Sequence, residues 1–155
     1  MTTRKQAPRK QALDDWAPDH MARWLEAVTK RLRADLAAAG AFPFPELRGS
    51  HRRLLQMIPA DGIRVTDLAR RAAMTKQALG EFMDWLEQAG FVVSGRDPAD
   101  GRVRLITRTR QGDAAAIEAT RAIEAVERRW RTEIGAAQYD AMKQALRDLG
   151  HGQIG

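Results

Sequence analysis

The sequence predicts a mainly helical protein with one β-hairpin, placed between long helices at the two ends of the chain. Three observations support this fold class. Apolar residues recur at spacings of three and four in both end segments, which is typical of amphipathic helices. Two short helical segments in the middle are separated by a tight connection. Two short β-rich segments, with turn-forming residues between them, follow directly.

The composition restricts the function. The chain has 155 residues, a net charge of +6 and no cysteine, so disulfides, thiolate zinc sites and thiol redox switches are excluded. We find neither a signal peptide nor an apolar run of membrane-spanning length, so the expected location is the cytoplasm and no membrane partner is expected. The excess of basic over acidic residues favours a polyanionic partner such as nucleic acid.

The N-terminal segment divides into a tail and a helix. Residues 1–13 are basic, with no acid, and are expected to be flexible. A basic arm that touches DNA phosphates is the alternative reading of this tail. A helix is expected over about 15–39, and Gly40 is a suitable residue to end it. Its apolar stripe comprises Met21, Trp24, Leu25, Val28, Leu32 and Leu36.

The middle of the chain is predicted to form three helices. The first begins near Pro45 or Glu46 and ends before Pro59, with Leu47, Leu54, Leu55 and Ile58 inward. Two short helices follow, with Thr66 and Thr75 as expected N-caps. The first of these carries Leu68, Ala69 and Ala72 inward, and the second buries Leu79, Phe82, Met83 and Leu86 and ends at Gly90. Two helices joined through Ala73-Met74 are a helix-turn-helix.

The hairpin and two further helices complete the chain. Strands are expected at 91–93 and 103–107, around a turn at 97–101, and together they form a wing. A helix of roughly 25 residues should follow to residue 134, and a last helix should hold Tyr139. The end helices carry apolar stripes that need a partner, including Trp24, Leu32, Val126, Trp130, Met142 and Leu146.

Enzymatic chemistry is not expected. The three histidines, His20, His51 and His151, lack metal-ligand spacing. No glycine-rich phosphate loop is present, and the acids lie mostly beside Lys or Arg on exposed helix faces. We therefore expect no catalytic residue, no metal and no cofactor.

The second helix of the helix-turn-helix is the candidate for reading DNA. In such motifs this helix enters the major groove and its N-terminal residues meet base edges. Gln can bond adenine, Lys can reach guanine, and Thr can contact a methyl group or a phosphate. An ordinary polar helix face is the alternative reading. The candidate contacts are Thr75, Lys76, Gln77, Gly80 and Glu81.

The distribution of charge indicates that the second helix of the helix-turn-helix is not the main source of electrostatic affinity for DNA. Residues 75–89 contain one Lys and three acids, whereas residues 96–110 contain five Arg and two Asp. The wing, the tail and the arginines at 48, 52 and 53 are therefore expected to neutralise phosphate. The wing arginines are Arg96, Arg102, Arg104, Arg108 and Arg110.

Several motifs resemble the MarR family of winged-helix regulators. They are Val65-Thr66-Asp67-Leu68-Ala69, Met74-Thr75-Lys76-Gln77, Leu86-Glu87-Gln88-Ala89-Gly90-Phe91-Val92, Arg96-Asp97-Pro98-Ala99-Asp100-Gly101-Arg102 and Thr109-Arg110-Gln111-Gly112. The resemblance runs over about 46–112, and the order of the flanking helices also fits. The Asp-Pro-x-Asp-x-Arg wing followed by Thr-x-x-Gly is its most specific part.

The resemblance implies a domain organisation and a set of partners. Residues 14–155 would be a single domain, with dimerisation helices at 14–45 and 111–155 around a DNA-binding lobe at 46–110. The chain would act as a homodimeric, ligand-responsive repressor on a pseudo-palindromic double-stranded operator. Asp100 would orient Arg102 toward the minor groove. An interaction module for protein or RNA, without its own operator, is the alternative function.

The chain departs from the family pattern at three positions. Gly101 stands where a second wing arginine is common, and Arg108 replaces a usual apolar residue. Trp85 replaces a usual polar residue of the recognition helix, and we expect it to pack against a neighbouring helix.

The resemblance also implies an effector pocket between the dimerisation helices and the DNA-binding lobe. Its effector would be a small aromatic or apolar molecule. Core or dimer packing is the alternative role for each candidate. The candidates are Trp16, His20, Trp24, Phe42, Phe44, His51 and Leu55.

Overall fold

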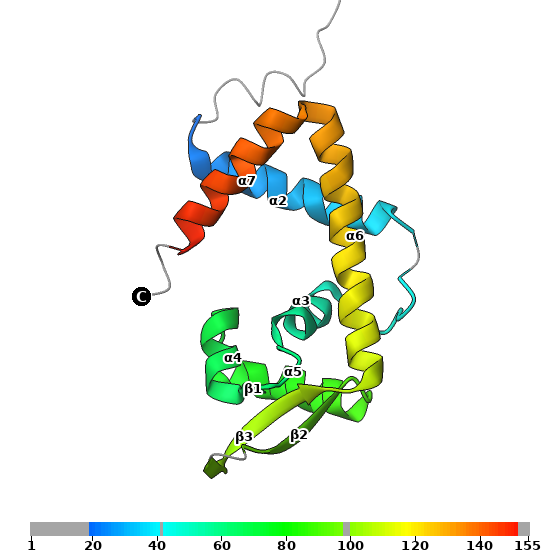
Figure 1. Ribbon diagram of the computed structural model, residues 1–155, viewed down its shortest axis with the longest axis vertical. Coiled ribbons are helices and arrows are strands. Elements are labelled where there is room, and N and C mark those ends of the chain that lie inside the picture. The colour runs from blue at the N-terminus through cyan, green and yellow to red at the C-terminus, as the bar shows by residue number, and fades with distance from the viewer. Residues whose placement is uncertain (1–18, 41, 98–99, 152–155) are drawn as a thin grey trace, which may run out of the picture. The chain divides into compact units, whose positions relative to one another are not determined.

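The computed structural model describes residues 19–40, 42–97 and 100–151. The chain forms two compact units, Met1–Ala38 and Ala39–Gly155. The first contains helix α2, and the second contains the helices α3 to α7 and the sheet (Figure 1). Within the described residues, no helix has the length and apolar character needed to cross a membrane.

Helix α2 covers Met21–Ala38 and has no buried residue. Its start is held by His20, whose Nδ1 accepts a hydrogen bond from the backbone amide of Arg23 at 3.2 Å. The expected apolar stripe is present, but Met21, Trp24, Leu25 and Val28 are exposed. The first residues of the expected helix, 15–18, lie outside the described residues, as does the basic tail.

Helix α3, Gly49–Met57, begins later than expected. Leu47 donates a backbone hydrogen bond to Phe44 in a turn, and Arg48 is extended as the N-cap. His51 is the third helical residue, and its Nδ1 accepts from the Arg48 amide at 3.2 Å. This contact reproduces half of a capping box with an imidazole in place of the usual Glu or Gln, so the usual sequence motif of a capping box is absent.

The helix-turn-helix is formed by α4, Val65–Ala72, and α5, Lys76–Gln88. The expected N-cap Thr66 is wrong, because Arg64 occupies the cap position, without a side-chain capping hydrogen bond, and Thr66 lies inside the helix. Ala73 takes the left-handed conformation with φ of 53° and makes the tight connection possible. Thr75 caps α5 as expected, because its Oγ1 accepts from the Ala78 amide at 3.1 Å.

The sheet contains β1 (Ile63–Arg64), β2 (Val92–Asp97) and β3 (Asp100–Arg108), in the order β1-β3-β2 and antiparallel. Both wing strands are longer than predicted, and Asp97 pairs with Asp100 across the hairpin. Residues 98–99 of the expected turn lie outside the described residues. Strand β1 was not predicted, because two residues are too few to show a strand periodicity.

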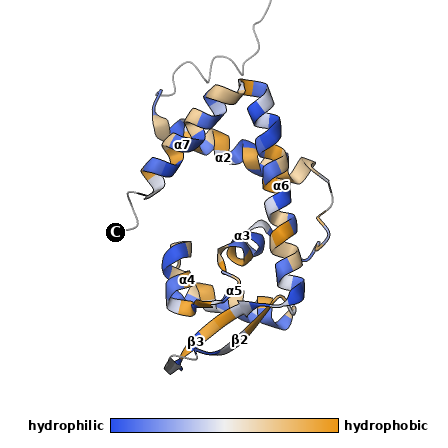
Figure 2. Cartoon of the chain, in the orientation of Figure 1, coloured by the Kyte–Doolittle hydropathy of each residue, from blue (hydrophilic) through white to orange (hydrophobic). Residues whose placement is uncertain are grey.

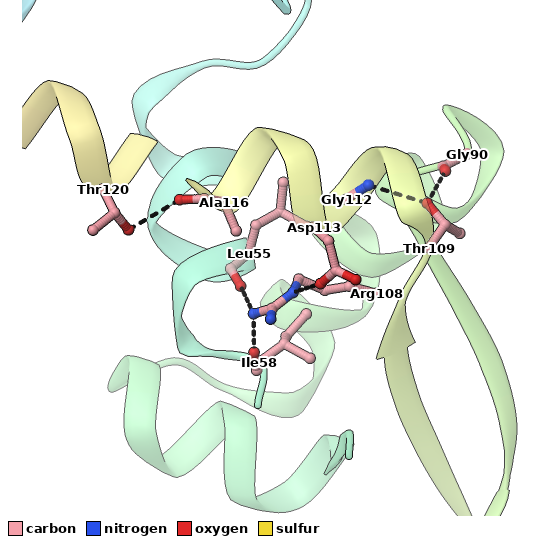
Figure 3. Close-up of polar contacts among 9 residues, drawn as sticks. All are labelled: Leu55, Ile58, Gly90, Arg108, Thr109, Gly112, Asp113, Ala116 and Thr120. Carbon is pink, nitrogen blue, oxygen red and sulfur yellow. Dashed lines mark hydrogen bonds and ion pairs between the residues drawn. The ribbon is translucent and has the colours of Figure 1, made fainter. Parts of the chain in front are cut away.

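Helices α6, Arg110–Ile134, and α7, Ala136–His151, confirm the last two predicted helices. Thr109 caps α6 by accepting from the Gly112 amide, and its hydroxyl donates to the Gly90 carbonyl at 2.6 Å (Figure 3). A Cβ on Gly112 would lie 1.9 Å from the Phe91 carbonyl oxygen. The Thr-x-x-Gly motif thus joins the start of α6 to the end of the recognition helix.

The core lies inside the winged lobe, the part of the chain formed by α3, α4, α5 and the sheet. Leu79, Met83 and Leu86 of α5 are fully buried, whereas Phe82 is only partly buried. Helix α3 and the first turns of α6 close the other side, and Gln56 donates to Thr120 between them at 3.1 Å. Most of the predicted core is confirmed, and it comprises Leu47, Leu54, Leu55, Ile58, Leu68, Ala69 and Ala72 in addition to the α5 residues.

Candidate nucleic-acid interface

Helix α5 has one buried face and one polar face. Leu79, Met83 and Leu86 face the core, and Phe82 and Trp85 pack against it, whereas the polar side chains of the helix lie on the other side. Gly80 is half-buried, and a Cβ there would meet nothing within 4 Å, so the helix backbone is accessible at this position. The exposed candidate contacts are Thr75, Lys76, Gln77 and Glu81. The structure therefore brings the five candidates of the recognition helix together on one side.

The wing presents Arg96 and Arg102 to solvent. Arg96 Nη1 donates to the Gly101 carbonyl at 3.3 Å, a contact that joins the two strands near the tip. The side chain of Asp100, which was expected to orient Arg102, lies outside the described residues. Two exposed guanidinium groups on one hairpin form a surface that favours phosphate oxygens.

Arg104 is turned toward the recognition helix. Its Nη2 lies 2.9 Å from Glu87 Oε2 and 3.6 Å from Asp84 Oδ1, and its Nε donates to Ser94 Oγ at 2.8 Å. The Ser94 amide also donates to Glu87 Oε1, at 2.8 Å. The Ser94 amide, with the Ser94 hydroxyl and Arg104, lowers the pKa of Glu87 against the opposing effect of burial.

Arg108 does not reach the DNA-facing surface. Its side chain is 16% exposed, and Nη1 donates to the carbonyls of Leu55 and Ile58 at the end of α3, while Nε pairs with Asp113 at 2.7 Å (Figure 3). Counting Arg108 among the phosphate-neutralising arginines of the wing was therefore wrong. It is a structural group that donates to backbone carbonyls at a helix C-terminus.

A second ion pair ties the wing to the helix-turn-helix. Arg64 Nε, at the start of α4, lies 2.7 Å from Oδ2 of Asp97, which is 9% exposed. Neither this pair nor the contacts of Glu87 were predicted from the sequence. Arg64 and Asp97 are 33 positions apart, and Glu87 lies 7 positions from Ser94 and 17 positions from Arg104. No local sequence pattern links residues at these separations.

Comparisons with known proteins agree with this geometry. Residues 54–103 match the model of the MarR family. The chain is 33% identical over 98 residues, 63% of its length, to the helix-turn-helix transcriptional repressors Rv2887 of Mycobacterium tuberculosis and Mb2911 of Mycobacterium bovis, and it covers 69% of each. This chain belongs to the MarR family. Members of the family are transcription regulators and not enzymes.

Solved MarR-family structures share the fold. CouR from Rhodococcus jostii RHA1, bound to p-coumaroyl-CoA, superposes with a TM-score of 0.70 at 22% identity, over 84% of this chain and 92% of CouR. BpsR from Bordetella bronchiseptica, whose DNA binding is regulated by 6-hydroxynicotinic acid, superposes with a TM-score of 0.70 at 19% identity, over 85% of this chain and 94% of BpsR. MarR from Escherichia coli in its reduced form superposes with a TM-score of 0.71 at 16% identity, over 86% of this chain and 98% of that protein.

Among the candidates for a MarR effector pocket, His51 has the most distinctive surroundings. It is 8% exposed, stacks on Trp85 with ring centroids 4.1 Å apart, and meets the edge of Phe82 at 5.4 Å. The expectation that Trp85 packs against a neighbouring helix is therefore confirmed. Burial, followed by the charge of Arg48, lowers the pKa of His51. Because Nδ1 accepts a hydrogen bond, the neutral ring carries its proton on Nε2.

A hollow of about 340 Å³ lies beside this aromatic group. Within the described part of the chain, His51 Nε2 makes no hydrogen bond, so its proton is available to a molecule in the hollow. The lining residues are Glu46, Arg48, His51, Glu81, Phe82 and Trp85.

The effector candidates Phe42, Phe44 and Leu55, which belong to the same unit, do not line this hollow. Leu55 is fully buried in the core, and Phe44 packs edge-on against Phe91 at 5.6 Å. Phe42 contacts Phe44 at 5.8 Å and lies under the guanidinium of Arg52. Trp24 and His20 belong to the α2 unit, and Trp16 lies outside the described residues. Packing within the lobe, the alternative role given to these candidates, explains the positions of Phe44 and Leu55.

Proposed function

We propose that this protein is a homodimeric, ligand-responsive repressor that binds a pseudo-palindromic DNA operator. The observation that carries the proposal is the α5 face, where exposed Thr75, Lys76 and Gln77 lie opposite fully buried Leu79 and Met83. A relative at 33% identity is a transcriptional repressor, which supports repression rather than activation.

In this proposal the recognition helix reads bases and the wing supplies charge. Thr75, Lys76, Gln77, Gly80 and Glu81 enter the major groove. The wing residues Arg96, Arg102 and Arg104 meet phosphates or the minor groove, with Asp100 orienting Arg102.

Binding to the DNA upstream of the protein's own gene tests this proposal. We expect retardation of a duplex from this region in a gel-shift assay, and a footprint with two related half-sites. The centres of the half-sites should lie about one helical turn apart, roughly 34 to 36 Å. Failure to bind any duplex more tightly than a random one would favour the alternative of a protein or RNA interaction module.

The dimer is proposed from the apolar surface of the helices outside the winged lobe. Helices α2, α6 and α7 carry hydrophobic segments between hydrophilic ones (Figure 2). Leu146 and Leu149 of α7 are 48% and 65% exposed, and Trp24 of α2 is 52% exposed. Exposed apolar side chains of this size are typical of a surface that a second copy covers.

The effector is proposed to bind in the hollow beside His51. An aromatic ring with a hydrogen-bond acceptor would pack on Phe82 and Trp85 and accept from His51 Nε2. Because Phe82, Trp85 and Glu81 belong to α5, an occupant of the hollow contacts the recognition helix directly. It shifts DNA affinity only if it binds the free and the DNA-bound arrangement unequally.

Calorimetry with 6-hydroxynicotinic acid and p-coumaroyl-CoA tests the effector site. These probes are chosen because related structures name them. We expect binding by wild type and loss of binding in His51→Phe, which keeps an aromatic ring and removes the donor. Trp130→Phe is the control, because Trp130 lies on α6 and not in the hollow. Equal binding by His51→Phe and wild type would place the site elsewhere.

A further inference from the structure

Glu87 joins the recognition helix to both strands of the wing. Its two carboxylate oxygens accept from the Ser94 amide at 2.8 Å, the Ser94 hydroxyl at 2.9 Å and Arg104 Nη2 at 2.9 Å. Arg104 Nε closes the ring by donating to Ser94 Oγ. We name these three residues the Glu87 clamp. Its members come from α5, β2 and β3, so one carboxylate connects the two parts of the lobe expected to touch DNA.

General electrostatics disfavours an acid at this position. Glu87 lies in the last turn of α5, where the helix dipole favours a positive charge. It also lies on a lobe whose proposed partner is a polyanion. Its pKa is nevertheless lowered, first by the Ser94 amide, so the contacts to the wing outweigh the burial that opposes ionisation.

The clamp meets two needs of the wing itself. Strand β2 is an edge strand, and Glu87 satisfies the Ser94 amide on it. Arg104 also lies directly opposite Arg96 in the β2–β3 register, and like charges across a strand pair repel. The carboxylate of Glu87 offsets this repulsion while keeping both arginines on the hairpin.

The clamp also gives Arg104 a defined orientation. Two of its nitrogens are occupied by Glu87 and Ser94, while Nη1 makes no hydrogen bond in the part of the chain that the structure describes. The side chain remains 42% exposed. A guanidinium held on one edge can present the opposite edge to a phosphate at little entropic cost.

We propose that Glu87 is a positioning residue for DNA binding, which fixes the wing relative to the recognition helix through Ser94 and orients Arg104 toward the DNA backbone. This inference rests on the proposed function. It predicts an effect opposite in sign to that of simple charge repulsion, because removing this negative charge should weaken binding to a polyanion.

The first test compares Glu87→Gln and Glu87→Ala with Asp84→Asn in a gel-shift titration of the operator duplex. Asp84→Asn is the matched control, because it removes the same charge from the same helix and Asp84 lies only 3.6 Å from Arg104. We expect Glu87→Ala to bind about tenfold more weakly, the scale of one charge-assisted hydrogen bond. We expect Asp84→Asn to bind as tightly as wild type or more tightly. Tighter binding by both Glu87 variants would overturn the proposal.

A double-mutant cycle separates positioning from loss of stability. If Glu87 acts in part through Arg104, Glu87→Gln should reduce affinity less in the Arg104→Met background than in wild type. Fully additive effects would contradict this mechanism. Thermal unfolding of each variant shows whether a loss of affinity merely follows loss of the fold.

Hydrogen exchange tests the clamp without DNA. The Ser94 amide should be protected in wild type and in Asp84→Asn and should exchange faster in Glu87→Ala, with core amides unchanged. Unchanged protection in Glu87→Ala would refute the clamp even in a protein that binds DNA. If the clamp is present but wild type binds no duplex, the proposed function fails instead.

Discussion

Single residues of the winged lobe divide into those proposed to contact DNA and those that hold the lobe together. Gln77 and Arg102 are exposed and belong to the first group. Glu87, Arg108 and Arg64 have partners within the lobe and belong to the second. A charge count along the sequence cannot separate these groups, because Arg102 and Arg108 contribute equally to it.

Base reading and phosphate contact are distinguished by two substitutions. Gln77→Ala should relax base preference, at a cost of about 1–3 kcal/mol on the best site and less on other sites. Arg102→Ala should weaken binding to all sequences, with some extra loss where A·T-rich flanks narrow the minor groove. Competition titrations with a panel of half-site variants measure both effects. Intact binding by Arg102→Ala would show that the wing assignment is wrong.

His51 is expected to make stability depend on pH. Its pKa is lowered in the folded protein, so below its usual value of about 6.5 the unfolded chain takes up the proton more readily. The free energy of unfolding should therefore fall as pH drops from about 7.5 to about 5.5. In His51→Phe this part of the pH dependence should disappear. Urea denaturation at both pH values measures the free energy of unfolding. The same change with pH in His51→Phe as in wild type would contradict the prediction.

At the scale of elements, the junction of α5, β2, β3 and α6 holds the wing. Thr109 donates to the Gly90 carbonyl and Arg108 reaches the end of α3 (Figure 3). Gly112 lies against the backbone of Phe91. The Thr-x-x-Gly motif, noticed in the sequence only as a family feature, has a physical explanation here. The helix can start at this place only if its third residue has no side chain.

Gly112→Ala should therefore destabilise the protein, although alanine is the better helix former. The new Cβ would lie 1.9 Å from the Phe91 carbonyl oxygen, so α6 must move. Overpacking of this kind costs about 1–3 kcal/mol. Gly150→Ala in α7 is the matched control, because a Cβ there meets nothing within 4 Å, and it should be neutral or stabilising. Urea denaturation that finds Gly112→Ala as stable as wild type would refute the close contact.

At the scale of the whole molecule, DNA affinity should depend steeply on salt. The basic wing and tail accompany a net-acidic recognition helix, so binding would rest on counterion release. With roughly 6 to 10 phosphates neutralised by a dimer, affinity should fall by about 10³ to 10⁵ between 50 and 200 mM salt. Fluorescence anisotropy across this range measures the slope, and a flat response would exclude the electrostatic account.

The assembly is predicted to be a dimer at micromolar concentration. Of the apolar residues expected to need a partner, Trp24 and Leu146 are exposed. Val126 is only 2% exposed, so its inclusion was wrong, because α6 packs against α3 and α7 of the same chain. Sedimentation equilibrium tests the prediction, with Leu146→Asp and Leu149→Asp expected to shift the equilibrium toward monomer. A wild-type protein that remains monomeric would remove the palindromic operator as well.

The sequence by itself determined the order of the helices, the helix-turn-helix, the hairpin and most of the core. These features depend on periodicity and on local caps, such as Thr75 with Ala78 and Thr109 with Gly112, whose partners lie three residues apart. The tertiary structure alone decided where the long charged side chains go. Arg108 reaches carbonyls 50 and 53 positions away, and Arg104 reaches Glu87 17 positions away. A flexible side chain chooses among distant partners only after the backbone has brought them together, and no local pattern encodes that choice.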